Sequence, residues 1–183
     1  MAVAKTLWGY IERRDHRVMR RMNSWSAPRW IRFWMLAATR MGDGWLWYSL
    51  AFLVLAMGGA QRYVAVGAAG CAAIVGVMVF KLLKWISRRP RPCQYEPHCW
   101  SKVLPPDQFS FPSGHTMTAF AIALVVSYFY QGLEGPMYFL AISIAISRVV
   151  LGMHFLSDVL AGAVLGSALG LASIVTFASY GLV

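Results

Sequence analysis

The sequence predicts an all-α integral membrane protein: a helical bundle with about five transmembrane helices, preceded by amphipathic helices at the membrane interface. Of the 183 residues, 58% are hydrophobic and only 13% are charged, whereas soluble domains carry about 25% charged residues. The charges are unbalanced, with 17 Lys and Arg against 7 Asp and Glu and a net charge of +10. The apolar content excludes a disordered chain, and the long uncharged stretches argue against a nucleic-acid-binding module. The length favours one domain, residues 1–183.

The first 43 residues predict helices that lie on the membrane surface. In a helical projection, apolar side chains lie on one side and Lys and Arg on the other, which suits an anionic membrane surface. A solvated basic arm is the alternative. Residues 29–40 are rich in aromatics but interrupted by Arg32 and too short to span, so they predict a second interfacial segment. The apolar side contains Leu7, Trp8, Ile11, Val18, Met19 and Met22, and the basic side contains Lys5, Arg13, Arg17, Arg20 and Arg21.

Residues 44–183 predict the transmembrane catalytic core, because five stretches in them are nearly free of charge. A membrane helix needs about 20 mostly apolar residues. Continuous apolar runs favour helices over strands, and in lipid only helices and closed barrels satisfy every backbone group. Buried helices of a soluble protein are the alternative, but these normally show a polar face. The predicted spans are residues 44–61, 63–80, 116–133, 135–147 with an extension past Arg148 to 152, and 159–183.

The last span carries a stripe of glycines. Gly162, Gly166 and Gly170 recur at every fourth residue, so they line one helix face and let another backbone approach closely. The stripe suits packing inside the chain or, alternatively, a homodimer.

A basic loop between the second and third spans is the first candidate for a functional site. Residues 81–112 contain six Lys and Arg against two acids, which suits either a positive-inside anchor or an anion site. The loop ends at Ser113, a natural N-cap, and Gly114, which lets a ligand approach the backbone N–H groups. A helix N-terminus of this kind binds anions, and His115 would reach the bound group or serve as a capping histidine.

A second cluster follows the fourth span. Arg148 lies at membrane level, where a charge costs about 2.5–3.5 kcal/mol and indicates function. His154 and Asp158 are four residues apart, so on a helix they share a face and can hydrogen-bond. An Asp that accepts from Nδ1–H leaves the Nε2 lone pair free as a nucleophile or base. A structural pair at an interface is the alternative.

Together, these clusters resemble the three motifs of the type 2 phosphatidic acid phosphatase (PAP2) family, in order and in internal spacing. One such motif would be weak evidence, whereas three in register are strong. The matching residues are Lys84 with Arg91-Pro92 in the first motif, Pro112-Ser113-Gly114-His115 in the second, and Ser147-Arg148, His154 and Asp158 in the third.

The resemblance implies a phosphatase of the acid phosphatase and vanadium haloperoxidase superfamily that needs no metal and no cofactor. His154 would attack phosphorus to form a phosphohistidine, and Asp158 would orient it. His115 would protonate the leaving oxygen and then take a proton from water. The residues expected to hold the phosphoryl oxygens are Lys84, Arg91, Arg148, Ser113 and the Gly114 amide. The spacing from Lys84 selects Arg91, which leaves Arg88 and Arg89 as expected surface or headgroup contacts.

The expected substrate is a lipid phosphate or diphosphate, such as phosphatidate, phosphatidylglycerol phosphate or undecaprenyl diphosphate. The short chain resembles compact bacterial members of the family. The expected partners are this substrate and membrane lipids, with no nucleic acid. A vanadium-dependent haloperoxidase-like enzyme and a non-catalytic lipid-binding membrane protein are the alternatives.

The basic N-terminal region predicts how the chain lies in the cell (inner) membrane. By the positive-inside rule the first 43 residues are cytoplasmic, and five spans then bring both catalytic loops to that face. Cys93 and Cys99 are close enough to pair. A disulfide would indicate an external site, and free thiols would fit the cytoplasm.

Overall fold

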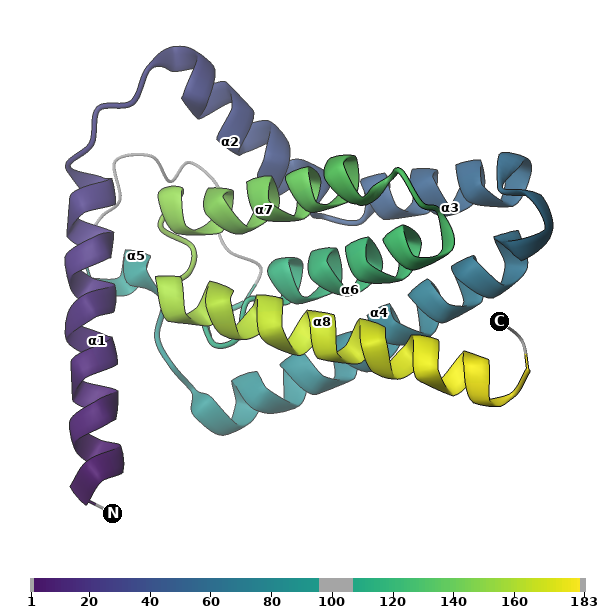
Figure 1. Cartoon of the computed structure of the whole chain (residues 1–183). Helices are drawn as coiled ribbons and strands as arrows, with labels where there is room; N and C mark the ends of the chain where they lie inside the picture. Colours follow the sequence, from purple (N-terminus) through teal and green to yellow (C-terminus); the bar gives the residue numbers. More distant parts are fainter. Residues whose placement is uncertain (1, 96–106, 182–183) are drawn as a thin grey trace.

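The computed structural model describes residues 2–95 and 107–181, and apart from one isolated β-bridge every regular element in these ranges is helical. This confirms the all-α class. Five helices run side by side and form the bundle, while α1 lies across one end of it (Figure 1). The bundle helices are α3 (Trp45–Met57), α4 (Arg62–Ser87), α6 (Gly114–Phe129), α7 (Glu134–Val150) and α8 (Leu156–Ser179). The other elements are α1 (Ala2–Asn23), α2 (Arg29–Met41), a 3-10 turn (Gly59–Gln61) and α5 (Pro92–Tyr95).

Helix α6 is the centre of the bundle, with ten of its sixteen residues buried. It packs against α4, α7 and α8. The glycine stripe of α8 lies directly against it: a Cβ added at Gly166 would lie 2.2 Å from the Met117 carbonyl oxygen, and one at Gly162 would lie 2.7 Å from that of Ser113. The stripe is therefore used for packing inside the chain, where small residues let helix backbones approach closely. The predicted homodimer stays a prediction.

The outer surface of the bundle is apolar. Phe52 on α3 is 76% exposed and Val164 on α8 is 69% exposed, whereas small residues such as Ala119 and Ala123 fill the interior. An exposed apolar surface with a small-residue interior is what a lipid environment favours, since burial of large side chains does not drive folding there. The chain is accordingly a membrane protein.

The helices differ in length from the predicted spans. The segment Gly59–Ser87 and helix α8 are long and apolar enough to cross a membrane, whereas α3 and α6 are shorter. The predicted first span, 44–61, ends at Met57 because the chain turns at Gly58 and Gly59, the latter with a φ of 67°. The number of spans stays a prediction.

The two N-terminal helices pack on the bundle through their buried faces. In α1 the arginines of the predicted basic side, Arg13, Arg17, Arg20 and Arg21, are exposed. Met19 on the opposite side is buried, but so is Asp15, one turn before it. Helix α2 packs on α7 and exposes Trp30 and Phe33, as an interfacial segment would. The apolar face of α1 is thus turned at least partly toward the protein, whereas its contact with membrane lipids stays a prediction.

The ends of four helices meet beside α1 (Figure 1). They are the last turns of α4 and α7 and the first turns of α6 and α8. These turns and the loop residues next to them carry the three predicted motifs. Whether Cys93 and Cys99 form a disulfide or stay free thiols stays a prediction, because Cys99 lies within 96–106, outside the described residues.

Candidate active site

A cavity of about 760 Å³ opens at this end of the bundle. Its walls include Gly114 and at least one side chain from each of the three motifs. Ser113 and Asp158 are buried and do not line it. Two acidic residues that the sequence did not single out, Asp43 and Asp107, also line it. The predicted residues on the cavity wall are Lys84, Arg91, Gly114, His115, Arg148 and His154.

Arg91 is held rigidly next to the predicted nucleophile. Its side chain is 1% exposed, and its Nη1 donates to the Met153 carbonyl at 2.7 Å and lies 3.2 Å from Nε2 of His154. An isolated bridge between Pro90 and Phe109 pairs the two parts of the loop and brings Asp107 to the other side of the guanidinium. The His154 Nε2 therefore faces a fixed cation.

The geometry of His154 and Asp158 differs from the prediction. Helix α8 begins at Leu156, so His154 precedes it and the two residues do not share a helix face. The His154 Nδ1 lies 3.7 Å from Asp158 Oδ2, beyond hydrogen-bond distance, and this buried nitrogen has no hydrogen-bond partner among the described residues. Asp158 Oδ2 instead accepts the Phe155 N–H at 2.9 Å, which caps α8. The prediction of this hydrogen bond is wrong for this structure, although Asp158 lies beside the imidazole.

His154 is neutral at neutral pH. Burial is the largest cause that lowers the pKa of its imidazole well below the ordinary 6.5, and the charges of Arg148 and Arg91 act in the same direction. A neutral imidazole keeps a lone pair, which nucleophilic attack requires.

Arg148 is a buried cation with unused donor capacity. Its side chain is turned toward the cavity, and its Nη1 donates to Thr39 Oγ1 at 2.6 Å. Its Nε is buried without a hydrogen-bond partner in the described part of the chain. A buried donor of this kind costs free energy unless a ligand satisfies it, so the site suits an anion.

Asp107 joins two of the predicted phosphate-binding cations. Lys84 Nζ donates to its Oδ2 at 2.6 Å and Arg91 Nη2 donates to its Oδ1 at 2.7 Å. Burial alone would raise the pKa of this carboxyl, but the hydrogen bonds from Lys84 and Arg91 outweigh burial and hold the pKa below its ordinary value. Sequence reasoning missed Asp107 because its only signal was its place as one of two acids in a basic loop.

The start of α6 agrees in part with its predicted role. Ser113 occupies the N-cap position, but its side chain makes no capping hydrogen bond and its Oγ accepts one from Thr116 Oγ1 at 3.0 Å. Gly114 lies on the cavity wall, and the first N–H groups of a helix have no intrahelical partner. Helix α6 therefore presents its N-terminus to the cavity, as an anion site requires.

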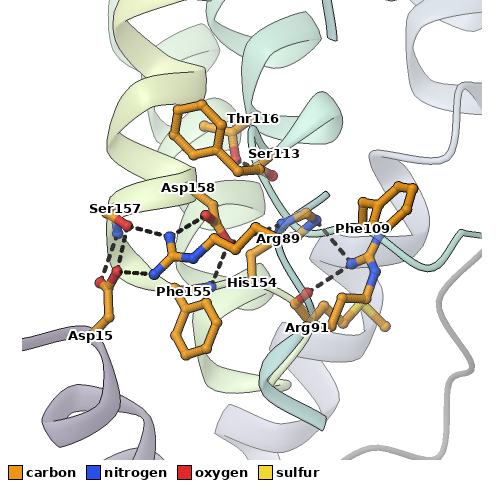
Figure 2. A network of polar contacts seen from close by, with 12 residues as sticks. Asp15, Arg89, Arg91, Phe109, Ser113, Thr116, His154, Phe155, Ser157 and Asp158 are labelled. Carbon is orange, nitrogen blue, oxygen red and sulfur yellow. Dashed lines mark hydrogen bonds and ion pairs between the residues drawn. The ribbon is translucent and has the colours of Figure 1, made fainter. Parts of the chain in front are cut away.

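Arg89 is the clearest correction, because its predicted place was the surface. It bridges two carboxylates: Nη1 lies 2.6 Å from Asp158 Oδ1 and Nη2 lies 2.7 Å from Asp15 Oδ2 (Figure 2). Its side chain is 9% exposed. The cause is the end of α4, where Arg88 adopts a left-handed conformation with a φ of 46° and stays exposed while the chain reverses and turns Arg89 inward.

Asp15 completes this network from α1. It accepts hydrogen bonds from the backbone N–H and the hydroxyl of Ser157, in addition to its ion pair with Arg89 (Figure 2). The N-terminal helix is thereby joined to the carboxylate beside His154. The division between residues 1–43 and 44–183 therefore does not separate the interfacial region from the site, since Asp15, Thr39 and Asp43 all precede residue 44.

Comparisons with known proteins agree with the three motifs. The PAP2 superfamily model matches residues 62–180. The chain is 35% identical over 140 residues to decaprenylphosphoryl-5-phosphoribose phosphatase of Mycobacterium tuberculosis (strain ATCC 25618 / H37Rv), covering 74% of this chain and 77% of the relative. It is 36% identical over 99 residues to phosphatidylglycerophosphatase B of Bacillus subtilis, covering 47% and 45%.

Solved structures show the same fold. Aquifex aeolicus LpxE superposes with a TM-score of 0.72 at 25% identity, covering 86% of this chain and 93% of that one. The PAP2-type phosphatidylglycerolphosphate phosphatase of Bacillus subtilis superposes with a TM-score of 0.71 at 22% identity, covering 93% and 87%. The match to residues 62–180 includes every residue of the three motifs. The chain therefore belongs to the PAP2 superfamily.

Proposed function

We propose that this protein is a membrane lipid phosphatase that hydrolyses the terminal phosphate of a lipid phosphate or diphosphate through a phosphohistidine on His154. The observation that carries the proposal is a neutral His154 that lines a cavity together with three buried cations, Lys84, Arg91 and Arg148, with its Nε2 3.2 Å from the Arg91 guanidinium. Phosphoryl transfer depends mainly on positioning and on neutralising the equatorial oxygens, and three fixed cations with a helix N-terminus supply both. We infer that the reaction needs no metal ion.

The reaction has two steps. In the first, the Nε2 lone pair of His154 attacks phosphorus, the P–O bond to the leaving group (an ester in a lipid phosphate, an anhydride in a diphosphate) breaks, and a protonated His115 gives its proton to the leaving oxygen. In the second, His115 takes a proton from water, the hydroxide attacks phosphorus, and the P–N bond breaks to release inorganic phosphate. His154 is then neutral again and His115 is protonated, so protons balance over the cycle.

An apolar extension of the cavity supports a substrate with a hydrocarbon chain. A second cavity of about 230 Å³ lies between α3, α4 and α6, and it shares Trp47, Gly70 and Ile122 with the site cavity. The relatives are named for polyprenyl and glycerol lipid phosphates. We propose phosphatidate, phosphatidylglycerol phosphate and undecaprenyl diphosphate as the substrates to compare.

We also propose that the chain crosses the cell (inner) membrane several times, with its active site on the cytoplasmic side. The exposed basic side of α1 supports this orientation, because α1 lies at the site end of the bundle and cytoplasmic segments are enriched in Lys and Arg.

A phosphate-release assay in detergent with EDTA tests the reaction. We expect the wild type to release phosphate from at least one of the three lipids, and His154→Ala to lose about 10³-fold or more of the rate. A control, Gln131→Ala at the exposed turn at the far end of the bundle, should retain full activity. Equal release by wild type and His154→Ala would refute the mechanism. Halide oxidation with vanadate and peroxide, without phosphate release, would favour a haloperoxidase instead.

A further inference from the structure

The turn between α2 and α3 places a carboxylate next to His115. Asp43 stands between two glycines, and each is required by the geometry. A Cβ at Gly42 would lie 2.8 Å from His115 Cδ2 and 3.2 Å from Ile144 Cγ2, so only glycine lets the turn approach the imidazole. Gly44 has a φ of 117°, a conformation that L side chains rarely adopt. The turn is thus built to hold Asp43 at this position.

The contact between the two side chains is direct. Asp43 Oδ1 lies 2.8 Å from His115 Nε2, and both side chains line the site cavity. The other carboxylates near the site have different partners: Asp107 accepts from Lys84 and Arg91, and Asp158 is paired with Arg89. Asp43 is 41% exposed, so its oxygens stay accessible to water in the cavity.

We propose that Asp43 is the positioning residue for His115, holding its imidazole by Nε2–H so that Nδ1 is the nitrogen that transfers the proton. This inference rests on the phosphatase reaction proposed above. Lys84 and Arg148 line the same cavity and repel an imidazolium. The Asp43 carboxylate opposes this repulsion and stabilises the charge that appears when His115 takes a proton from water. No atom of Asp43 contacts phosphorus or the leaving oxygen in these steps.

Asp43 and Gly42 lie outside residues 62–180, the range that the superfamily model matches. The proton donor belongs to the shared core, whereas the residue that orients it comes from the preceding N-terminal region. A neighbour on the same region, Thr39, holds the Arg148 guanidinium at 2.6 Å. The end of α2 and the turn after it therefore act as a support for two groups of the core.

The leaving group of the substrate separates a proton-donor defect from a structural one. The leaving group of a lipid phosphate such as phosphatidate is a basic alkoxide that needs a proton. The leaving group of 2,4-dinitrophenyl phosphate is a stable phenolate that does not. We expect Asp43→Asn to lower kcat for phosphatidate about 10²-fold with KM nearly unchanged. The burst of dinitrophenolate in the first turnover should change less than about threefold, because that step bypasses the donor. Glu134→Gln, a matched acid-to-amide change at the far end of the bundle, should behave as wild type.

Two further variants complete the test. His115→Ala should show the same dependence on the leaving group, and Asp43→Asn added to His115→Ala should cause no further loss, since the two residues act as one unit. Asp43→Glu, which keeps a carboxylate, should recover part of the activity lost in Asp43→Asn. Equal slowing of phosphatidate turnover and of the dinitrophenolate burst, no slowing of either, or additive losses would overturn the role of Asp43. A wild type that releases phosphate from neither substrate would instead refute the phosphatase proposal.

Discussion

At the scale of single residues, burial sets the chemistry of His154. Its side chain is 1% exposed and shares its cavity with buried cations, so the charged imidazolium is disfavoured relative to water. A depressed pKa means that His154, the proposed nucleophile, stays neutral at pH values where an ordinary histidine is half protonated. The same burial makes protonation favour the unfolded chain, where the pKa is ordinary. Stability contributed by His154 is therefore present above pH 6.5 and is lost as the pH falls toward the folded pKa.

Histidine NMR tests this directly, because the chain has only four histidines. With ¹⁵N-labelled histidine in detergent, we expect the His154 ring nitrogens to keep the chemical shifts of a neutral imidazole at pH 6.5 and to titrate only at lower pH. His154→Gln identifies the resonances by their loss. Half-protonation of His154 near pH 6.5 would contradict the expectation.

At the scale of elements, helix α1 is fastened to the catalytic end of the bundle by one buried carboxylate. Asp15 is only 4% exposed at its side chain and pairs with Arg89, which in turn pairs with Asp158. Ion pairs at this depth lose much of their benefit to desolvation, but removal of one partner leaves the others buried and uncompensated. The position of α1 and the position of Asp158 are therefore coupled through the Arg89 guanidinium and through Ser157, the neighbour of Asp158 in the chain.

Asp15→Asn tests this coupling with little change in shape. We expect a loss of about 2–3 kcal/mol in the free energy of unfolding, because Arg89 keeps Asp158 but loses one charged partner. Thermal unfolding in detergent measures the loss, and limited trypsin digestion should cleave α1 faster in the variant. Glu12→Gln, on the exposed side of the same helix, is the control and should match the wild type in both measurements. Unchanged stability and digestion of Asp15→Asn would show that apolar contacts alone dock α1.

At the scale of the whole molecule, apolar and basic residues occupy different parts of the protein. The sides of the bundle are apolar, whereas exposed arginines are concentrated on α1. Helix α1 lies at the same end of the bundle as the site (Figure 1). A bundle with this distribution exposes its sides to lipid and one end to the headgroups. A substrate with its phosphate at the headgroup level would meet the cavity at the same depth.

Cysteine labelling in intact cells tests the proposed orientation. In a variant with Cys71, Cys93 and Cys99 changed to Ser, a single Cys at Ser26 should resist a membrane-impermeant maleimide until the cells are opened. A single Cys at Gln131, in the turn between α6 and α7, should react from outside. Both original residues are exposed, so protein burial does not decide the result. The reverse pattern would place the active site on the external face, and phosphatase activity retained by each variant confirms that it is folded.

Local patterns were sufficient to predict the helical class, the membrane character and the three motifs. Apolar runs and motif spacings are properties of residues that are close in sequence, so they predict helices without any knowledge of tertiary contacts. The same patterns were insufficient for the exact helix ends, as α3 shows, because a pair of glycines stopped the helix inside an apolar run.

The partners of the site residues depended on contacts that no local pattern contains. Asp43 is 72 residues from His115 in the chain, and Asp15 is 74 residues from Arg89. The turn of the chain at the end of α4 decides that Arg91 lines the site cavity and that Arg89 is buried as a bridge between two carboxylates. Residue spacing was enough to predict the candidate reactive groups, because they lie in or next to the ends of helices. The packing of helices that are distant in sequence decided which carboxylates pair with those groups. A charged side chain is buried only where the folded chain places a partner beside it.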